Sequence, residues 1–196
     1  NRDMSYSVSH SANTPDHFSK PVTTRIAAAV ETLGYTTLVD WAMRLLSGET
    51  TPQAESDPDI KLLGGMEAIE PYMARVWAGQ ALLHAWHHMA ADAVQTALDD
   101  EIWQVREVAA QLAAQHKLPY VDELVTLLTD DAYPHVRIAA AKALGEVAAP
   151  QHEAALQALQ QLVMDPNTML AGAAEDALGE IAKRHNRPDL AVASRY

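Results

Sequence analysis

The amino-acid sequence predicts an all-α fold, a solenoid in which antiparallel helical hairpins stack on one another. A short phrase containing Arg75, Arg106 and Arg137 recurs at intervals of 31 residues, and a degraded copy containing Ala171 follows after 34 residues. A period of this length is typical of helical repeats, each of which buries its apolar face only against its neighbours. Aromatic residues make up only 6% of the chain, and no segment alternates apolar and polar residues as a strand would.

The first 65 residues lie outside the repeats. Residues 1–20 are polar and are predicted to form an N-terminal arm. Two helices are predicted, at residues 22–33 and 37–47, and a proline-containing acidic loop follows at 49–58. We expect these helices to cap one end of a single solenoid domain, residues 21–196.

The repeats themselves are predicted to occupy residues 66–185, with residues 186–196 as a C-terminal tail. The predicted helices are 71–85, then 89–98 with 101–115, 119–128 with 133–147, and 151–164 with 168–185. Each hairpin turn is a short acidic step whose carboxylate is expected to cap the following helix, at Asp99-Asp100, Asp130-Asp131 and Asp165-Pro166.

One repeat resembles a known family. The string from Asp131 to Val147, with Val136-Arg137-Ile138-Ala139-Ala140-Ala141 at its centre, is similar to a HEAT repeat of the kind also called phycobilisome-lyase-like. The string from Asp100 to Leu112 is a second copy. The Arg75 copy lacks the preceding aspartate, and the last copy has Ala171 in place of the arginine. The resemblance covers residues 66–185 and implies a right-handed α-α superhelix, an architecture shared by many scaffold proteins.

A recurring acid and base suggest how the repeats are held together. Asp100 precedes Arg106 by six residues, and Asp131 precedes Arg137 by the same number. A carboxylate and a guanidinium therefore recur on one edge of the array, and we expect them to form a ladder between stacked repeats. The alternative interpretation is an anion or carboxylate site on that edge.

The second helix of each repeat is predicted to present one face to the inner surface of the curve. Offsets from the repeat arginine place the following residues there: Gln80, His84, Glu107, Gln111, Ile138, Lys142, Glu146, Asp176 and Glu180. Carboxylates outnumber the single lysine, which favours binding of a basic or amphipathic protein segment. The alternative is an ordinary solvated face. Three aromatic residues lie near the starts of these helices: Tyr72, Trp103 and Tyr133. They either contribute strongly to binding at the rim of the inner face or pack over the ends of neighbouring helices.

A histidine cluster is the best candidate for catalysis. His84, His88 and Asp92 are four residues apart and would share one face of an unbroken helix, as a metal site requires. The repeat register instead places His87 and His88 in a turn, so we predict neither a metal nor a cofactor. A metal-dependent or ligand-modifying enzyme, hydroxylase- or lyase-like, that uses His84, His87 and His88 is the alternative to a non-catalytic interaction module.

The charge balance weighs against nucleic acid as a partner. The chain has 14 basic and 26 acidic residues and a formal charge of −12, whereas phosphate binding requires clustered lysine and arginine. No apolar run approaches the ~18 residues of a membrane span, and no signal-like segment opens the chain. The absence of cysteine fits a cytoplasmic protein. The oligomeric state and the partner's identity are left open by the sequence.

Overall fold

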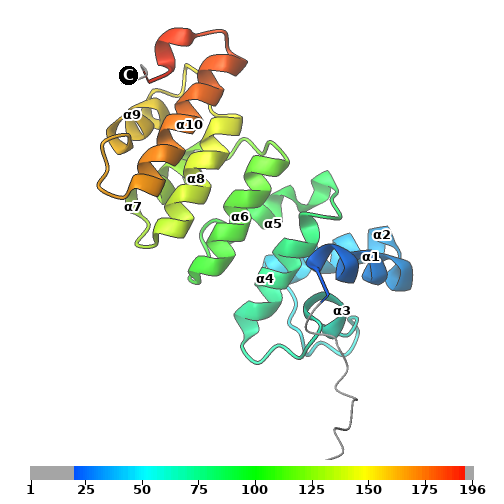
Figure 1. The fold of residues 1–196 in the computed structure, drawn as a ribbon. Coiled ribbons are helices and arrows are strands. Elements are labelled where there is room, and N and C mark those ends of the chain that lie inside the picture. The colour runs from blue at the N-terminus through cyan, green and yellow to red at the C-terminus, as the bar shows by residue number, and fades with distance from the viewer. Residues whose placement is uncertain (1–19, 193–196) are drawn as a thin grey trace, which may run out of the picture.

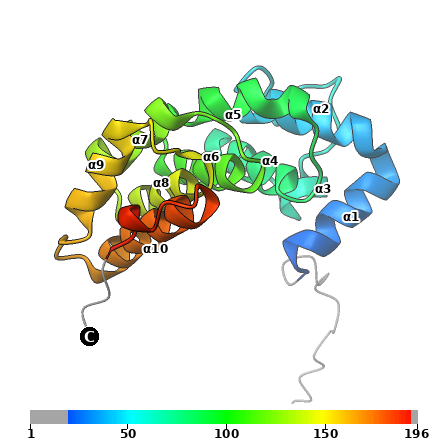
Figure 2. The same ribbon diagram turned by 90° about the horizontal axis from the view of Figure 1, so that it is seen from above.

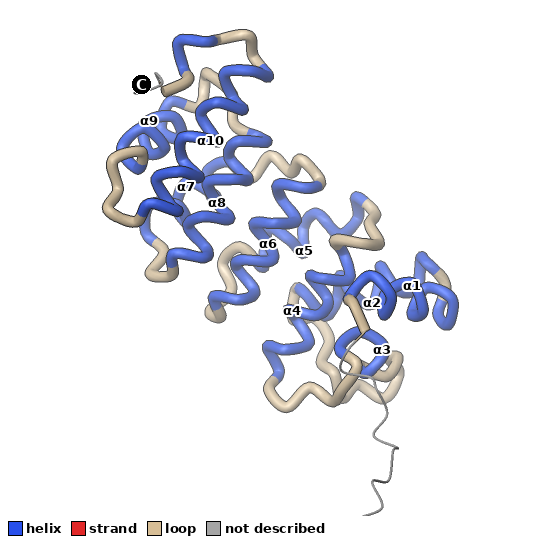
Figure 3. The backbone as a smooth tube through the Cα atoms, viewed as in Figure 1, coloured by secondary structure: helices blue, strands red, loops and turns tan. Residues whose placement is uncertain are grey.

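A computed structural model of the protein describes residues 20–192. The arm predicted for residues 1–20 therefore lies outside the described residues except for Lys20, as do the last four residues of the predicted tail. Helices and turns make up the whole described segment, in which no strand occurs (Figure 3). No helix within residues 20–192 has both the length and the apolar character needed to span a membrane.

The helices form two layers that follow a common curve (Figures 1 and 2). The inner layer consists of α4 (Pro71–Leu82), α6 (Trp103–Gln115), α8 (Pro134–Val147) and α10 (Thr168–Arg184). The outer layer consists of α2 (Tyr35–Leu46), α5 (Ala91–Ala97), α7 (Val121–Asp130) and α9 (Glu153–Leu162). Figure 2 shows α1 (Val22–Leu33) at the N-terminal end of the arc, with α3 (Lys61–Gly64) beside it. The concave side is therefore built from the second helices of the repeats.

The predicted helix positions agree with the structure except near several ends. The helix at 22–33 matches α1, whereas the helix predicted at 71–85 ends at Leu82 and the one predicted at 101–115 begins at Trp103. The helix predicted at 89–98 is divided into a single 3₁₀ turn, His88–Ala90, and the short α5. The four-residue helix α3 was not predicted. A second 3₁₀ turn, Pro188–Leu190, lies in the segment predicted as a tail.

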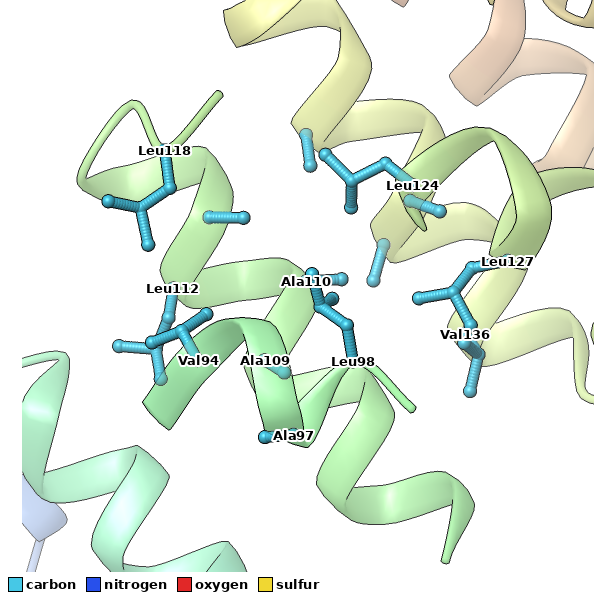
Figure 4. Close-up of a cluster of buried hydrophobic side chains, with 14 of the residues drawn as sticks. Val94, Ala97, Leu98, Ala109, Ala110, Leu112, Leu118, Leu124, Leu127 and Val136 are labelled. Carbon is cyan, nitrogen blue, oxygen red and sulfur yellow. The ribbon is translucent and has the colours of Figure 1, made fainter. Parts of the chain in front are cut away.

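Small residues allow the inner helices to approach closely. Buried alanines of α6 and α8 lie among leucines and valines of the neighbouring helices, as Figure 4 shows around Ala109, Ala110 and Leu112. A Cβ atom placed on Gly79 would lie 2.6 Å from Cγ1 of Val108, and one on Gly145 would lie 3.0 Å from Cα of Ala177. These contacts set the spacing between α4 and α6 and between α8 and α10.

An ion pair between Arg44 and Asp57 connects the acidic loop at residues 49–58 to α2. Arg44 Nε lies 3.0 Å from Asp40 Oδ2, and Arg44 Nη2 lies 3.0 Å from Asp57 Oδ1. Hydrogen bonds from Arg44 and from the Thr50 hydroxyl lower the pKa of Asp57, although burial opposes them. Arg44 therefore holds the loop against α2 and neutralises part of the loop's negative charge.

Candidate functional site

A groove of about 580 Å³ lies on the concave surface between α6 and α8. Residues of both helices, of the turn after α6 and of the start of α10 line it: Glu107, Gln111, Ala114, Gln115, Lys117, His135, Ile138, Ala139, Lys142, Glu146 and Met169. The structure thus brings together five residues that the helical offsets had placed on the inner face, namely Glu107, Gln111, Ile138, Lys142 and Glu146.

The charge of this groove is balanced, which differs from the acidic inner face expected from the sequence. Lys117 follows the end of α6 and forms an ion pair with Glu146 across the end of the groove. Lys142 and Glu107 add one charge of each sign to the lining, and no ion pair joins them among residues 20–192. Lys117 was missed because it lies in a turn, where its φ of 55° is left-handed, and helical offsets do not describe such a residue.

The acidic part of the concave surface lies beside the groove, on α10. Asp176 and Glu180 line a second, open depression of about 530 Å³ with Glu175, Gly179 and the chain at Ala191 and Val192. Among residues 20–192, no lysine or arginine lines it. The helices α8 and α10 pack directly against each other (Figure 1), so the helix that carries this acidic depression neighbours one wall of the groove.

Gln80 and His84 line neither of these hollows. Gln80 is half-buried on α4, and His84 is exposed in the turn that follows this helix. The predicted inner face therefore divides into three parts, and the α6/α8 groove contains five of its nine predicted residues.

Two of the predicted rim aromatics stack at the start of α6 and α8. The ring centroids of Trp103 and Tyr133 are 5.3 Å apart, and those of Trp103 and His135 are 5.7 Å apart. Tyr133 is 44% exposed. His135 also lines the groove, so the stack forms one of its ends. Tyr72 does not belong to this stack and is half-buried at the start of α4.

Arginine and aspartate side chains connect successive repeats. Arg75 Nε lies 2.8 Å from Asp100 Oδ2, and Arg106 Nε lies 2.7 Å from Asp131 Oδ2. Each arginine thus pairs with the aspartate of the next repeat, while Arg106 contacts its own repeat through the backbone oxygen of Asp100, at 2.8 Å. Arg137 donates to the backbone oxygen of Leu128, also at 2.8 Å.

The aspartates have a second role in the turns. Oδ1 of Asp100 accepts a hydrogen bond from the backbone N–H of Ile102, and Oδ1 of Asp131 accepts one from Tyr133, both at 2.9 Å. These hydrogen bonds stabilise the turn before the helix. The prediction that the aspartates cap the first helical N–H groups is therefore wrong for Asp100 and Asp131. The side chains of Arg106 and Asp131 are only 14% and 3% exposed. Such burial favours a structural role for this edge.

The histidine cluster is spread over a turn. Because α4 ends at Leu82 and α5 begins at Ala91, His84, His88 and Asp92 do not share one unbroken helix. Nδ1 of His87 accepts a hydrogen bond from the backbone N–H of Met89 at 3.2 Å, which caps the 3₁₀ turn. Within residues 20–192 no three His, Asp or Glu side chains converge as metal ligands would.

A further histidine, His116, was not singled out by the sequence. Its ring stacks on Trp86 at 3.9 Å with an interplanar angle of 7°, and its Nε2 lies 3.1 Å from the backbone oxygen of Leu82. Tyr35 completes the assembly, because its hydroxyl donates to the backbone oxygen of Trp86 at 2.8 Å. This cluster joins α2, the turn after α4 and the end of α6.

Replacing His116 with glutamine is expected to make stability less dependent on pH. Burial lowers the pKa of His116 below its usual 6.5. The imidazole of His116 therefore binds a proton more readily in the unfolded chain than in the folded one. The contribution of neutral His116 to the free energy of unfolding is fully present above about pH 6.5 and is lost as the pH falls through the folded pKa. Urea unfolding of both proteins between pH 8 and 5 checks this. A wild-type advantage that stays constant across this range would contradict it.

The fold defines the class of protein, an α-solenoid of stacked helical hairpins. Residues 90–179 match the family model of HEAT repeats, so this segment is a HEAT-repeat region. It contains α5 to α9 and most of α10, and therefore both walls of the groove. No curated protein sequence matches the chain.

Proposed function

We propose that the protein is a non-catalytic interaction module that binds a basic, amphipathic protein segment on its concave surface. HEAT repeats are generally protein-interaction modules. The observation that carries the proposal is the α6/α8 groove, in which Ile138, Ala139 and Met169 offer apolar contact beside charged side chains. Met169 is 72% exposed, although it is a large apolar residue. A partner would gain free energy by covering it.

The positions of the negative side chains favour a basic partner segment that extends from the groove to α10. Within the groove Lys117 already neutralises Glu146, whereas Glu107 has no ion pair among the described residues. The remaining negative charge lies at Asp176 and Glu180 on α10. Two helix spacings separate α6 from α10, about 20 Å, so a bound helix of roughly 14 residues would reach from the groove to the acidic depression.

The aromatic stack provides an end to such a binding path. Trp103 and Tyr133 are residue types that often anchor interfaces, and His135 connects them to the groove. An apolar or cationic side chain at one end of the segment would lie over this stack, and basic side chains at the other end would face α10. The proposal includes a cytoplasmic location and phycobilisome-lyase-like repeats, as the sequence predicts.

A peptide display library tests the proposal without a known partner. Peptides selected by the wild-type protein should be rich in lysine and arginine, with apolar residues at helical spacing, and their dissociation constants follow from fluorescence anisotropy. The double variant Glu107→Lys with Asp176→Lys should bind them about tenfold more weakly, a loss of about 1.4 kcal/mol.

A control variant carries the same change of charge on the outer layer. Asp130→Lys with Glu153→Lys alters exposed residues of α7 and α9, and its affinity should stay within about twofold of wild type. Selected peptides that are acidic, or that bind both variants equally, would overturn the proposed surface.

A further inference from the structure

We propose that a second site, between α1 and α3, binds a small organic anion that carries an apolar tail, such as an alkyl carboxylate. The pocket has a volume of about 430 Å³, which lies in the range of small-molecule sites. It is lined by Lys20, Thr24, Arg25, Ala28, Ala29, Thr32, Asp59, Lys61, Leu62 and Gly65. None of these residues lines the α6/α8 groove, so the site is independent of the proposed function.

Its cations point to an anionic ligand. Lys20, Arg25 and Lys61 line the pocket, and among residues 20–192 its lining contains one carboxylate, Asp59, in a chain whose formal charge is −12. Oδ1 of Asp59 accepts the backbone N–H of Lys61 at 2.9 Å, and the three cations outnumber this carboxylate. The pocket therefore has an excess of positive charge where the chain as a whole has the opposite sign, and this attracts anions.

Arg25 is held in place without losing its charge. Its Nε donates to the backbone oxygen of Leu63 at 3.2 Å, and its Nη1 donates to that of Lys20 at 2.7 Å. No carboxylate forms an ion pair with it among residues 20–192. A guanidinium oriented by carbonyl oxygens is preorganised for a carboxylate ligand. Lys61 forms an ion pair with the exposed Glu67, at 2.9 Å, and also feels the charge of Asp59. Exposed pairs of this kind are weak enough to be exchanged for a ligand.

The remaining lining is suited to an alkyl chain. Ala28 and Ala29 leave space along α1, and Leu62 forms the opposite apolar wall on α3. Thr32 donates its hydroxyl to the backbone oxygen of Ala28 at 3.0 Å, so its hydrogen is not directed into the pocket. A ligand with a charged head and a short aliphatic tail would satisfy both the cations and the apolar wall.

Octanoate is the probe that tests this site, with 1-octanol as the uncharged control of equal chain length. Titration followed by amide NMR should shift Thr24, Ala28 and Gly65 selectively. The dissociation constant for octanoate should be at least about tenfold lower than that for 1-octanol. Equal binding of the two compounds, shifts located elsewhere, or no shift at millimolar octanoate would each overturn the proposal.

Two charge variants make the test specific. Lys61→Glu changes an exposed side chain and should weaken octanoate binding about tenfold while leaving the thermal unfolding midpoint nearly unchanged. Lys142→Glu makes the same change in the α6/α8 groove and should leave octanoate affinity within about twofold. If both variants bind octanoate as the wild type does, the cations of the α1/α3 pocket play no part.

Discussion

Arg106→Ala is expected to lower the free energy of unfolding by about 3 kcal/mol, since removal of one partner of a largely buried ion pair leaves the other charge uncompensated. Asp131, at 3% exposure, would retain only the Tyr133 N–H at its carboxylate. The variant also loses the bond from Arg106 to the Asp100 backbone oxygen. A solenoid is stabilised by contacts between neighbouring repeats, so the variant is expected to weaken the contact between the repeats that contain α6 and α8.

Urea denaturation measures the effect, with an exposed pair as the control. Lys61→Ala removes a pair in which both side chains are more than half exposed, 53% and 70%, and should cost less than about 1 kcal/mol. The double variant Arg106→Ala with Asp131→Ala isolates the coupling between the two groups. A cost for Arg106→Ala no larger than that for Lys61→Ala would mean that the pair contributes little.

Gly145→Leu is expected to destabilise the protein by about 2–3 kcal/mol through overpacking. A Cβ atom at this position would lie 3.0 Å from Cα and 3.2 Å from Cβ of Ala177. The first of these is backbone, so α8 and α10 would have to move apart. Leucine is a better helix former than glycine, so helix propensity alone would raise the stability. The expected destabilisation must therefore come from packing.

Gly179→Leu is the matched control. Gly179 lies inside α10, and, apart from its chain neighbours and its own helix backbone, no heavy atom of residues 20–192 would lie within 4 Å of its added Cβ. This substitution should leave stability unchanged or raise it by up to about 1 kcal/mol. Thermal unfolding of the two variants side by side gives the comparison. Similar midpoints for both would contradict the close approach at Gly145.

The arrangement of the inner helices was predictable from the sequence. The interval between Arg106 and Arg137 fixes equivalent positions on α6 and α8, and a helix presents residues at constant offsets on one face. Glu107 and Ile138 occupy the same offset, and both line the groove. Periodicity alone could therefore identify much of this surface.

Contacts outside the regular helices could not be predicted in the same way. Lys117 reaches Glu146 because the backbone after α6 turns through a left-handed residue, and nothing in the repeat pattern encodes that conformation. A ladder between stacked repeats was expected, but which aspartate Arg106 pairs with depends on how far one repeat is displaced along the next. The pocket between α1 and α3 depends on residues about 40 positions apart in sequence, outside the repeats.

The side-chain links between inner helices differ from one junction to the next. Arg106 joins the start of α6 to Asp131 in the turn before α8, and Lys117, in the turn after α6, pairs with Glu146 near the end of α8. At the following junction Arg184 donates to the backbone oxygens of Gly145 and Ala148, at 2.8 and 2.6 Å. Arg137 instead stays within its own hairpin. The α6/α8 junction therefore depends on ion pairs, whereas the α8/α10 junction depends on hydrogen bonds to the main chain and on the close packing of Gly145 against Ala177. We expect added salt to weaken the first junction more than the second.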